Sequence, residues 1–311
     1  MIYRRWRPPP IMNERTEDVF FQPDVDARLR MRERDKVFAI GSCFARNVEA
    51  FLVPRFQVPS FVPKSEVPPD IAAMHPDLTA DLTLWHRYNV FSIRNSLVWA
   101  LTPDDVGARA RLLQVAPGRS VDPYAGSRTI LETSNAERLR GWIDATMAGV
   151  RACRVVIITL GLSEVWEDRQ TGLVMNAAPL TEMWTAFPDR FRFRVATCQE
   201  TLGALQEVHE VLSRHCAEGV QIVVTVSPVP LLATFRTLDI VVANAASKAI
   251  LRAAVDQWST EHENVHYFPS YEMILNSRQT DVWLDDFRHC RIDVIRRVMD
   301  VFLTQFVTLD G

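Results

Sequence analysis

The sequence lacks the features that mark membrane and secreted proteins. None of its apolar runs reaches the roughly 18 residues of a membrane-spanning helix. The first 20 residues carry positive charge but lack the apolar core of a secretory signal peptide. The five cysteines are odd in number and show no CxxC spacing, so no disulfide framework is predicted. We therefore expect a cytoplasmic protein with reduced thiols and no membrane span.

Phosphate-binding loops and metal-site motifs are missing as well. Neither G-x-G-x-x-G nor G-x-x-x-x-G-K-[ST] occurs, which argues against nucleotide or nicotinamide chemistry. His209 and His215 are six residues apart, whereas a zinc-binding HExxH helix needs its histidines one turn apart. A net charge of -3 gives no electrostatic reason to expect a nucleic-acid partner. We expect no cofactor, metal or nucleic acid; a homo-oligomer is compatible with the sequence.

Apolar residues make up 48% of the 311 residues, enough for one large buried core. Four short runs are continuously apolar and β-branched, which is typical of strands buried on both faces of a parallel sheet. Amphipathic helical patterns alternate with these runs and predict βαβ crossovers. We therefore predict an α/β fold, a three-layer α/β/α sandwich with a mostly parallel sheet. The predicted strands are VFAIG (37–41), RVVIITLG (154–161), VQIVVTVSP (220–228) and NVHYFPS (264–270).

Five helical patterns follow from the spacing of apolar residues. They cover residues 44–53, 135–153, 195–219, 239–262 and 291–307. Gly219 is the predicted C-cap of the third helix. The predicted buried face of the fourth helix contains Val242, Ala246, Ile250, Ala253 and Trp258, and that of the fifth contains Ile292, Ile295, Val298, Phe302 and Phe306.

The chain divides into a charged N-terminal extension, residues 1–35, and a single domain, residues 36–311. Residues 54–133 interrupt the alternation of strands and helices, and six prolines stand between residues 54 and 76. We predict a lid-like insertion there. A second interruption, at about 167–195, is rich in aromatic residues, which favours ordered packing over disorder.

Polar residues follow three of the predicted strands. Ser42 follows the first strand, and Ser227 follows the third. Gly161, Ser163 and Glu164 follow the second. Ligands of parallel α/β sheets bind beyond the carboxyl ends of the strands, so we expect these residues to meet in one cleft.

Ser42 and Cys43 are the two candidate nucleophiles in this arrangement. Ser42 stands where a helix begins, so it is either a helix N-cap or a nucleophile whose oxyanion the helix N-terminus stabilises. Cys43 would have a lowered thiol pKa at a helix N-terminus, but unpaired cysteines are also among the most buried residues. If Ser42 faces the cleft, we expect Cys43 to point into packing.

A nucleophilic serine needs a general base, and His289 is the candidate. Asp286 stands three residues before it, a spacing at which a carboxylate can bind the imidazole Nδ1–H and turn Nε2 toward the serine. The alternative interpretation is a surface ion pair between Asp285 and Arg288, with His289 capping the following helix.

The stretch FAIGSCFARNV resembles the signature of the GSCFA-domain proteins, a bacterial family grouped with the SGNH, or GDSL-type, hydrolases. Further blocks are similar to those of the family in the same order, so the resemblance covers about residues 36–290. These blocks are RYNVFS (87–92), IITLGLSEVW (157–166), VVTVSPVP (223–230), ANAASKAILRAA (243–254), VHYFPSYEMI (265–274) and DFRHC (286–290).

The resemblance implies a flavodoxin-like sheet and a catalytic triad of Ser42, Asp286 and His289. SGNH hydrolases usually carry an oxyanion-hole asparagine in the block that reads Gly161-Leu-Ser-Glu164 here, and this chain lacks it. We hypothesise that Asn89, Ser163 and the Ser42 backbone N–H supply the donors instead. Gly161, Glu164, Ser227 and Arg288 complete the predicted substrate site.

The expected function is a serine esterase that removes a small acyl group, such as acetyl, from a carbohydrate or a similar polar substrate. Two alternatives stay open: an O-acyltransferase with the same triad, and a non-catalytic module that binds a carbohydrate or another ligand. Trp85, His86 and Arg87 are candidate substrate contacts. Asn244, Ser247 and Lys248 are either further contacts or part of a packed helix face with Lys248 reaching outward.

Overall fold

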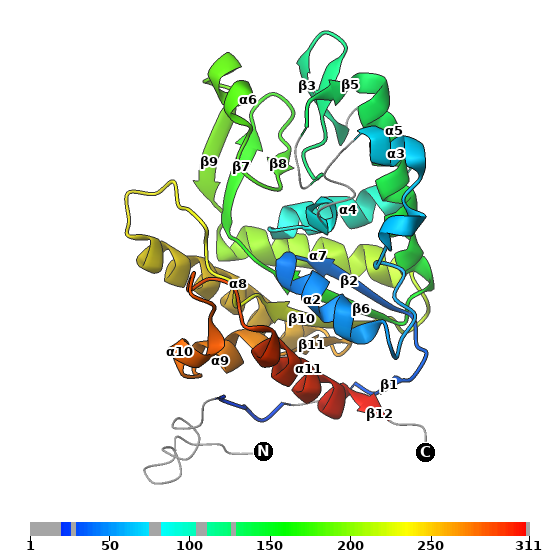
Figure 1. The fold of residues 1–311 in the computed structure, drawn as a ribbon, viewed down its shortest axis with the longest axis vertical. Coiled ribbons are helices and arrows are strands. Elements are labelled where there is room, and N and C mark those ends of the chain that lie inside the picture. The colour runs from blue at the N-terminus through cyan, green and yellow to red at the C-terminus, as the bar shows by residue number, and fades with distance from the viewer. Residues whose placement is uncertain (1–19, 26–28, 75–81, 104–110, 126–128, 309–311) are drawn as a thin grey trace.

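The computed structural model describes residues 20–25, 29–74, 82–103, 111–125 and 129–308 (Figure 1). Its centre is a four-stranded sheet in the order β11-β10-β6-β2, with every neighbouring pair parallel. The strands are β2 (Val37–Gly41), β6 (Val155–Leu160), β10 (Gln221–Val226) and β11 (Val265–Tyr267). All four strands predicted from continuous apolar runs are confirmed, because both faces of this sheet are buried.

Successive side chains of each strand point into two separate cores, which makes the fold three-layered. Phe38 and Ile40 face a core built with α4 (Val90–Leu101), α5 (Thr133–Met147), α7 (Cys198–His215) and α8 (Ile240–Glu261). Val37 and Ala39 face a core built with α2 (Cys43–Leu52), α9 (Ser270–Leu275) and α11 (Ile292–Phe306). The predicted α/β class is confirmed.

Two small antiparallel sheets stand above the parallel sheet in Figure 1. One contains β3 (Leu113–Ala116), β4 (Arg119–Val121) and β5 (Leu131–Glu132). The other, in the order β8-β7-β9, contains β7 (Glu164–Asp168), β8 (Val174–Met175) and β9 (Phe191–Val195), with α6 (Thr181–Ala186) between the last two. The expected ordered packing of residues 167–195 is confirmed.

The remaining elements are short. The strands β1 (Met31–Arg32) and β12 (Val307–Thr308) pair in parallel. The helices α3 (Pro69–Met74) and α10 (Gln279–Val282) and the 3-10 turns η1 (Lys64–Glu66), η3 (Leu82–Trp85) and η5 (Ala148–Ala152) lie in connections. No helix among the described residues is long and apolar enough to cross a membrane.

Two predictions about individual helices need correction. The helix predicted to end at Gly219 ends at His215, and Gly219 lies with φ +72° in the turn before β10. The helix α4 lies inside the predicted lid-like insertion but belongs to the core layer, because Ile93 and Leu97 are fully buried. Whether other parts of residues 54–133 move as a lid stays a prediction.

The buried face of α8 is also different from the predicted one. Val242, assigned to that face, is 55% exposed, whereas Ala243, Ser247, Lys248 and Leu251 are buried. The prediction followed apolar side chains alone, but the polar side chains of Ser247 and Lys248 find hydrogen-bond partners inside the protein. In α11 the predicted face is buried except for Ile292.

Candidate active site

A cleft of about 370 Å³ lies beyond the carboxyl ends of β2, β6 and β10. Ser42 and Cys43 line it after β2, Gly161 and Glu164 after β6, and Ser227 after β10. Arg288 joins them from the connection between α10 and α11. The ends of the three strands meet in one cleft as expected, although Ser163, which was predicted to join them, does not line it.

Two glycines let the chain approach closely at Ser42. Gly41 has φ +146°, and a Cβ atom there would lie 2.2 Å from the Thr159 carbonyl oxygen. At Gly161 a Cβ would lie 2.8 Å from the Tyr88 carbonyl oxygen and 3.3 Å from the Ser42 Cβ. Any larger residue at either position would push apart the backbone that holds Ser42.

Ser42 is 3% exposed and is held from several sides. Its backbone N–H donates to the Thr159 carbonyl oxygen (3.1 Å) and to Thr159 Oγ1 (3.0 Å). Its Oγ lies 3.3 Å from Thr159 Oγ1 and accepts a long 3.4 Å hydrogen bond from the Phe44 N–H. Ser42 is therefore the N-cap of α2, as one interpretation predicted, and it lines the cleft at the same time.

Cys43 also lines the cleft, although we expected it to point into packing. It is the first residue of α2 and is partly buried, because the cleft begins where the helix begins. Burial raises the pKa of the Cys43 thiol above its ordinary value. The thiolate that a nucleophilic cysteine requires is therefore disfavoured at this position.

Asp286 and His289 form the predicted pair. His289 Nδ1 lies 2.5 Å from Asp286 Oδ2, and the backbone N–H groups of His289 and Arg288 donate to Asp286 Oδ1 at 2.9 and 3.0 Å. These hydrogen bonds lower the pKa of Asp286 to about 2, and the bond from the His289 backbone N–H has the largest effect. Phe287, between them, has φ +50°, which marks a tight turn.

The alternative interpretation of this segment is wrong. Arg291, not His289, occupies the N-cap position of α11. Among the described residues Arg288 contacts His289 and forms no ion pair with Asp285. Both members of the pair stay accessible, with 50% of the His289 side chain and 47% of the Asp286 side chain exposed.

Arg288 connects this pair to the cleft. Its Nη1 lies 3.3 Å from His289 Nε2. A guanidinium can only donate, so this contact requires an unprotonated Nε2 and leaves the imidazole proton on Nδ1, facing Asp286. Arg288 Nε is buried without a hydrogen-bond partner. Ser42 and His289 form no hydrogen bond with each other in the described part of the chain.

The predicted oxyanion donors have other partners. Asn89 caps α4 by accepting the Ser92 N–H (2.9 Å), and its Nδ2 donates to the carbonyl oxygens of Met175 (2.8 Å) and Asn176 (3.4 Å). Ser163 Oγ lies 3.0 Å from Ser247 Oγ. Neither residue lines the cleft. The hypothesis that Asn89 and Ser163 face a substrate oxygen is therefore contradicted, because buried neighbours take up both side chains. The third predicted donor, the Ser42 backbone N–H, is likewise bound to Thr159.

Polar residues of α8 hold the strand ends beneath the cleft. Lys248 is fully buried, and its Nζ donates to the carbonyl oxygens of Gly161 (2.9 Å), Ser227 (2.8 Å) and Val229 (2.8 Å). Burial lowers the pKa of Lys248 to about 7. Asn244 Oδ1 accepts the Leu231 N–H at 3.1 Å. The outward Lys248 of one interpretation is wrong, since three carbonyl groups satisfy the ammonium inside.

The candidate contacts next to Asn89 also lie inside the protein. Arg87 is fully buried and donates to Ser96 Oγ and to three backbone carbonyl oxygens. Trp85 packs on Trp142 with ring centroids 5.3 Å apart. These side chains stabilise the fold behind the cleft, and neither Trp85, His86 nor Arg87 lines it.

The model of the GSCFA family matches residues 36–302 of the chain. This protein belongs to the GSCFA family. The match contains the whole parallel sheet, the cleft residues named above and the Asp286–His289 pair. A search of curated proteins finds no significant match.

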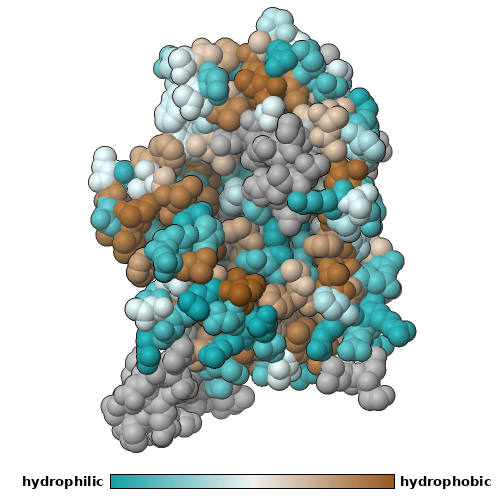
Figure 2. Space-filling view, viewed as in Figure 1, coloured by the Kyte–Doolittle hydropathy of each residue, from teal (hydrophilic) through white to brown (hydrophobic). Residues whose placement is uncertain are grey.

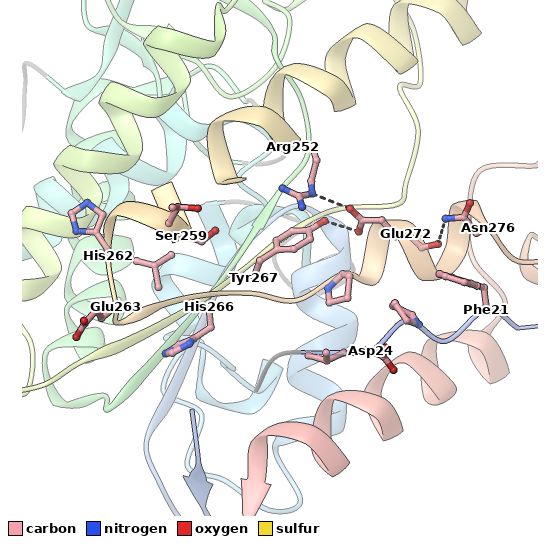
Figure 3. A pocket seen from close by; sticks show the side chains of 15 residues that line it. Phe21, Asp24, Arg252, Ser259, His262, Glu263, His266, Tyr267, Glu272 and Asn276 are labelled. Carbon is pink, nitrogen blue, oxygen red and sulfur yellow. Dashed lines mark hydrogen bonds and ion pairs between the residues drawn. The ribbon is translucent and has the colours of Figure 1, made fainter. Parts of the chain in front are cut away.

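A second cavity of this GSCFA protein is larger, about 700 Å³, and lies at the β11 edge of the sheet (Figure 3). Two of its charged side chains form an ion pair: Arg252 Nε donates to Glu272 Oε1 (2.9 Å), and the Tyr267 hydroxyl also donates to Glu272, at Oε2 (2.6 Å). It shares no residue with the cleft that contains Ser42. The smaller cleft is therefore the better candidate.

Sequence reasoning missed two parts of the site. Thr159, which holds Ser42, could have been noticed as a hydroxyl residue inside an otherwise apolar strand. The apolar side of the cleft contains Trp166, Phe193 and Phe235, and the only sign of it in the sequence was the high aromatic content of the surrounding segment.

The described residues contain no group of three or more His, Cys, Asp or Glu side chains placed to hold a metal ion.

Proposed function

We propose that this GSCFA protein is a serine acyl-ester hydrolase of the SGNH type, with Ser42 as nucleophile, His289 as general base and Asp286 as the group that orients the imidazole. The observation that carries the proposal is the position of Ser42. Ser42 lines a cleft at a helix N-terminus, and Arg288, which lines the same cleft, touches a histidine already paired with a carboxylate.

The proposed reaction has two acyl-transfer steps. Ser42 Oγ attacks the ester carbonyl carbon while His289 Nε2 takes its proton. The bond between that carbon and the alcohol oxygen then breaks, and the alcohol leaves with the proton from Nε2. Water attacks the acyl-Ser42 ester in the same way, gives one proton to Nε2 and releases the acid, and Ser42 regains its proton.

The state of His289 supports this assignment. Its two contacts fit the tautomer with the proton on Nδ1 and the lone pair on Nε2, the form that a general base requires. The mechanism needs the Arg288 guanidinium to leave Nε2 and the imidazole to approach Ser42 when substrate binds. Catalytic hydrogen bonds in ligand-free enzymes are often long and tighten in the substrate complex.

Arg288 is our candidate for the missing oxyanion donor. Its buried Nε has no partner in the protein, and its side chain lines the cleft with Ser42. A guanidinium donor aimed at developing negative charge would replace the asparagine that SGNH hydrolases usually carry. The positive end of α2 adds to this stabilisation.

The accessibility of the catalytic pair favours hydrolysis over transfer to another alcohol. Half of the His289 side chain is exposed, so water can reach the face where the alcohol departs. The same polar, open side suits a carbohydrate or a similar alcohol, which we keep as the proposed leaving group. A transferase would need an acceptor to compete with this water.

The test is hydrolysis of aryl esters and acetylated sugars by wild type, Ser42→Ala and Cys43→Ser. We expect Ser42→Ala to lower kcat/KM by about 10³-fold or more, and Cys43→Ser to keep most of the activity. Ester formation on an added sugar, faster than acid release, would identify a transferase. If Ser42→Ala hydrolyses every ester as fast as wild type, the proposal fails, and a non-catalytic binding module becomes the better account.

A further inference from the structure

One side of the Ser42 cleft is formed almost entirely by apolar side chains. Val165 and Trp166 come from β7, Met175 from β8 and Phe193 from β9. The segment after β10 supplies the rest, namely Val229, Pro230, Leu231, Leu232, Ala233 and Phe235. We call these residues the apolar wall.

Aromatic contacts hold the wall together. The Trp166 ring centroid lies 4.9 Å from that of Phe235, 5.6 Å from that of Phe193 and 4.7 Å from that of Trp184. Edge and tilted contacts at these distances are favourable aromatic geometries. The wall is therefore a preformed surface, built from two segments that lie on one side of the parallel sheet in Figure 1.

The outer part of the wall stays open to solvent. Phe235 is 46% exposed and Leu232 is 76% exposed. Figure 2 shows apolar surface gathered over the loop that precedes α8 and the start of that helix, where Leu238, Val241 and Val242 are also exposed. Exposed apolar side chains that continue into a cleft typically mark a binding site for apolar groups.

Charge on the cleft is restricted to two of the described lining residues, Glu164 and Arg288. Both carboxylate oxygens of Glu164 lie 2.9 Å from the Thr234 hydroxyl that donates to them. Arg288 belongs to the connection that carries Asp286 and His289. Thr234 thus occupies the Glu164 carboxylate within the wall segment, and Arg288 is the charged lining residue on the connection that carries the proposed proton donor.

We propose that the apolar wall binds the acyl chain of the substrate, and that this chain is a medium-length hydrocarbon rather than an acetyl group. The proposal rests on the proposed function, because Ser42 marks where the carbonyl carbon lies. At about 30 Å³ per heavy atom, the share of a water molecule in the liquid, a cleft of about 370 Å³ holds about twelve heavy atoms. An eight-carbon acyl group with part of its alcohol fits this volume.

The test is a series of p-nitrophenyl esters from acetate to decanoate. Each buried methylene is worth about fourfold in kcat/KM, equal to about 0.8 kcal/mol. We expect kcat/KM to rise from acetate to about octanoate. An acetate ester that reacts as fast as the octanoate ester would overturn the acyl-chain site and leave ester hydrolysis itself intact.

Two variants test whether the apolar wall causes the dependence of kcat/KM on acyl chain length. Phe235→Ala should lower kcat/KM about tenfold for the octanoate ester and less than twofold for the acetate ester, because it removes wall surface that only the long chain reaches. Leu275→Ala removes an exposed apolar side chain on α9, outside the cleft, and should change neither. Equal losses on both esters in Phe235→Ala would contradict the assignment.

Direct binding separates this inference from the enzyme proposal. Titration of Ser42→Ala protein with sodium octanoate, followed by calorimetry, should give saturable binding that Phe235→Ala weakens, whereas sodium acetate should give none. If no ester is hydrolysed but octanoate binds in this way, the hydrolase proposal fails and the apolar site stands. Absence of octanoate binding overturns the apolar site.

Discussion

The two halves of the proposed active site are built differently. Ser42 is almost fully buried, follows the edge strand β2 of the parallel sheet and is held by Thr159 and by the close approach of Gly41 and Gly161. Asp286 and His289 lie on an exposed connection and are held mainly by each other and by two backbone N–H groups.

Because of this difference, substitutions in the two halves should affect stability and catalysis differently. The nucleophile cannot move without the sheet, so changes around it should cost stability. The base and its carboxylate should tolerate substitution without loss of fold and can approach Ser42 when substrate arrives.

Removal of the imidazole tests the exposed half. His289→Ala should lower kcat/KM for the best aryl ester by about 10³-fold, the typical contribution of general acid–base catalysis. Thermal unfolding followed by circular dichroism should show an almost unchanged midpoint, because half of the side chain is exposed. A variant within tenfold of wild-type activity would remove His289 from the mechanism.

A methyl group on Gly41 tests the buried half. Gly41→Ala should lower the free energy of unfolding by about 3 kcal/mol or more, because the backbone has φ +146° and the new Cβ would meet the Thr159 carbonyl. Gly172→Ala is the matched control: it also has positive φ, +73°, but open space around it. Gly172→Ala should lower the free energy of unfolding by about 1 kcal/mol. Urea unfolding measures the loss in both variants. An equal loss in Gly41→Ala and Gly172→Ala would contradict the close approach of Gly41 to Thr159.

Substitution of the orienting carboxylate sharpens the contrast within the exposed half. Asp286→Asn should lower kcat about 10²-fold, and the neighbouring Asp285→Asn should change it little. Hydrogen bonds from His289 and Arg288 hold the pKa of Asp286 at about 2, below its ordinary 3.8.

The sign of that pKa shift fixes the pH behaviour. Because the folded-state pKa of Asp286 is depressed, its contribution to stability is present above about pH 4 and is lost as the pH falls through about 2. The loss of activity in Asp286→Asn should therefore persist at every pH of an ordinary assay. Recovery of the variant to wild-type activity at any pH between 5 and 9 would argue against the role.

The pH dependence of stability tests the burial of Lys248 beneath the cleft. Burial lowers its pKa to about 7 from an ordinary 10.5, so the unfolded chain binds more protons between these values. Stability should rise with pH in that window, by at most about 1.4 kcal/mol per pH unit. Lys248→Met should lose this rise, whereas Lys36→Met, at an exposed position, should keep it. The same pH slope in wild type and Lys248→Met would contradict the burial of a titrating amine.

Much of the fold was predictable because its signals are local. Continuous β-branched runs identified the strands β2, β6, β10 and β11. The spacing of apolar residues identified five helices, α2, α5, α7, α8 and α11. The meeting of Ser42, Gly161 and Ser227 followed from a rule about strand ends. The Asp286–His289 contact followed from their spacing along the chain.

The rest depended on partners that are distant in sequence. Asn89 looked like an available donor, but its amide binds the carbonyl of Met175, 86 residues away. Lys248 looked like a surface residue, but the carbonyls that it binds belong to three separate positions before it in the chain. The apolar wall joins β7 to a loop before α8, and no periodicity predicts such a contact.

The most direct test of the central claim is reaction with a fluorophosphonate probe, followed by peptide mass spectrometry. A serine activated by a neighbouring base is phosphonylated, whereas an N-cap serine without a base is not. We predict one adduct on Ser42, absent in Ser42→Ala, strongly slowed in His289→Ala and retained in Cys43→Ser. Folded wild-type protein that forms no adduct on Ser42 would contradict the serine hydrolase account.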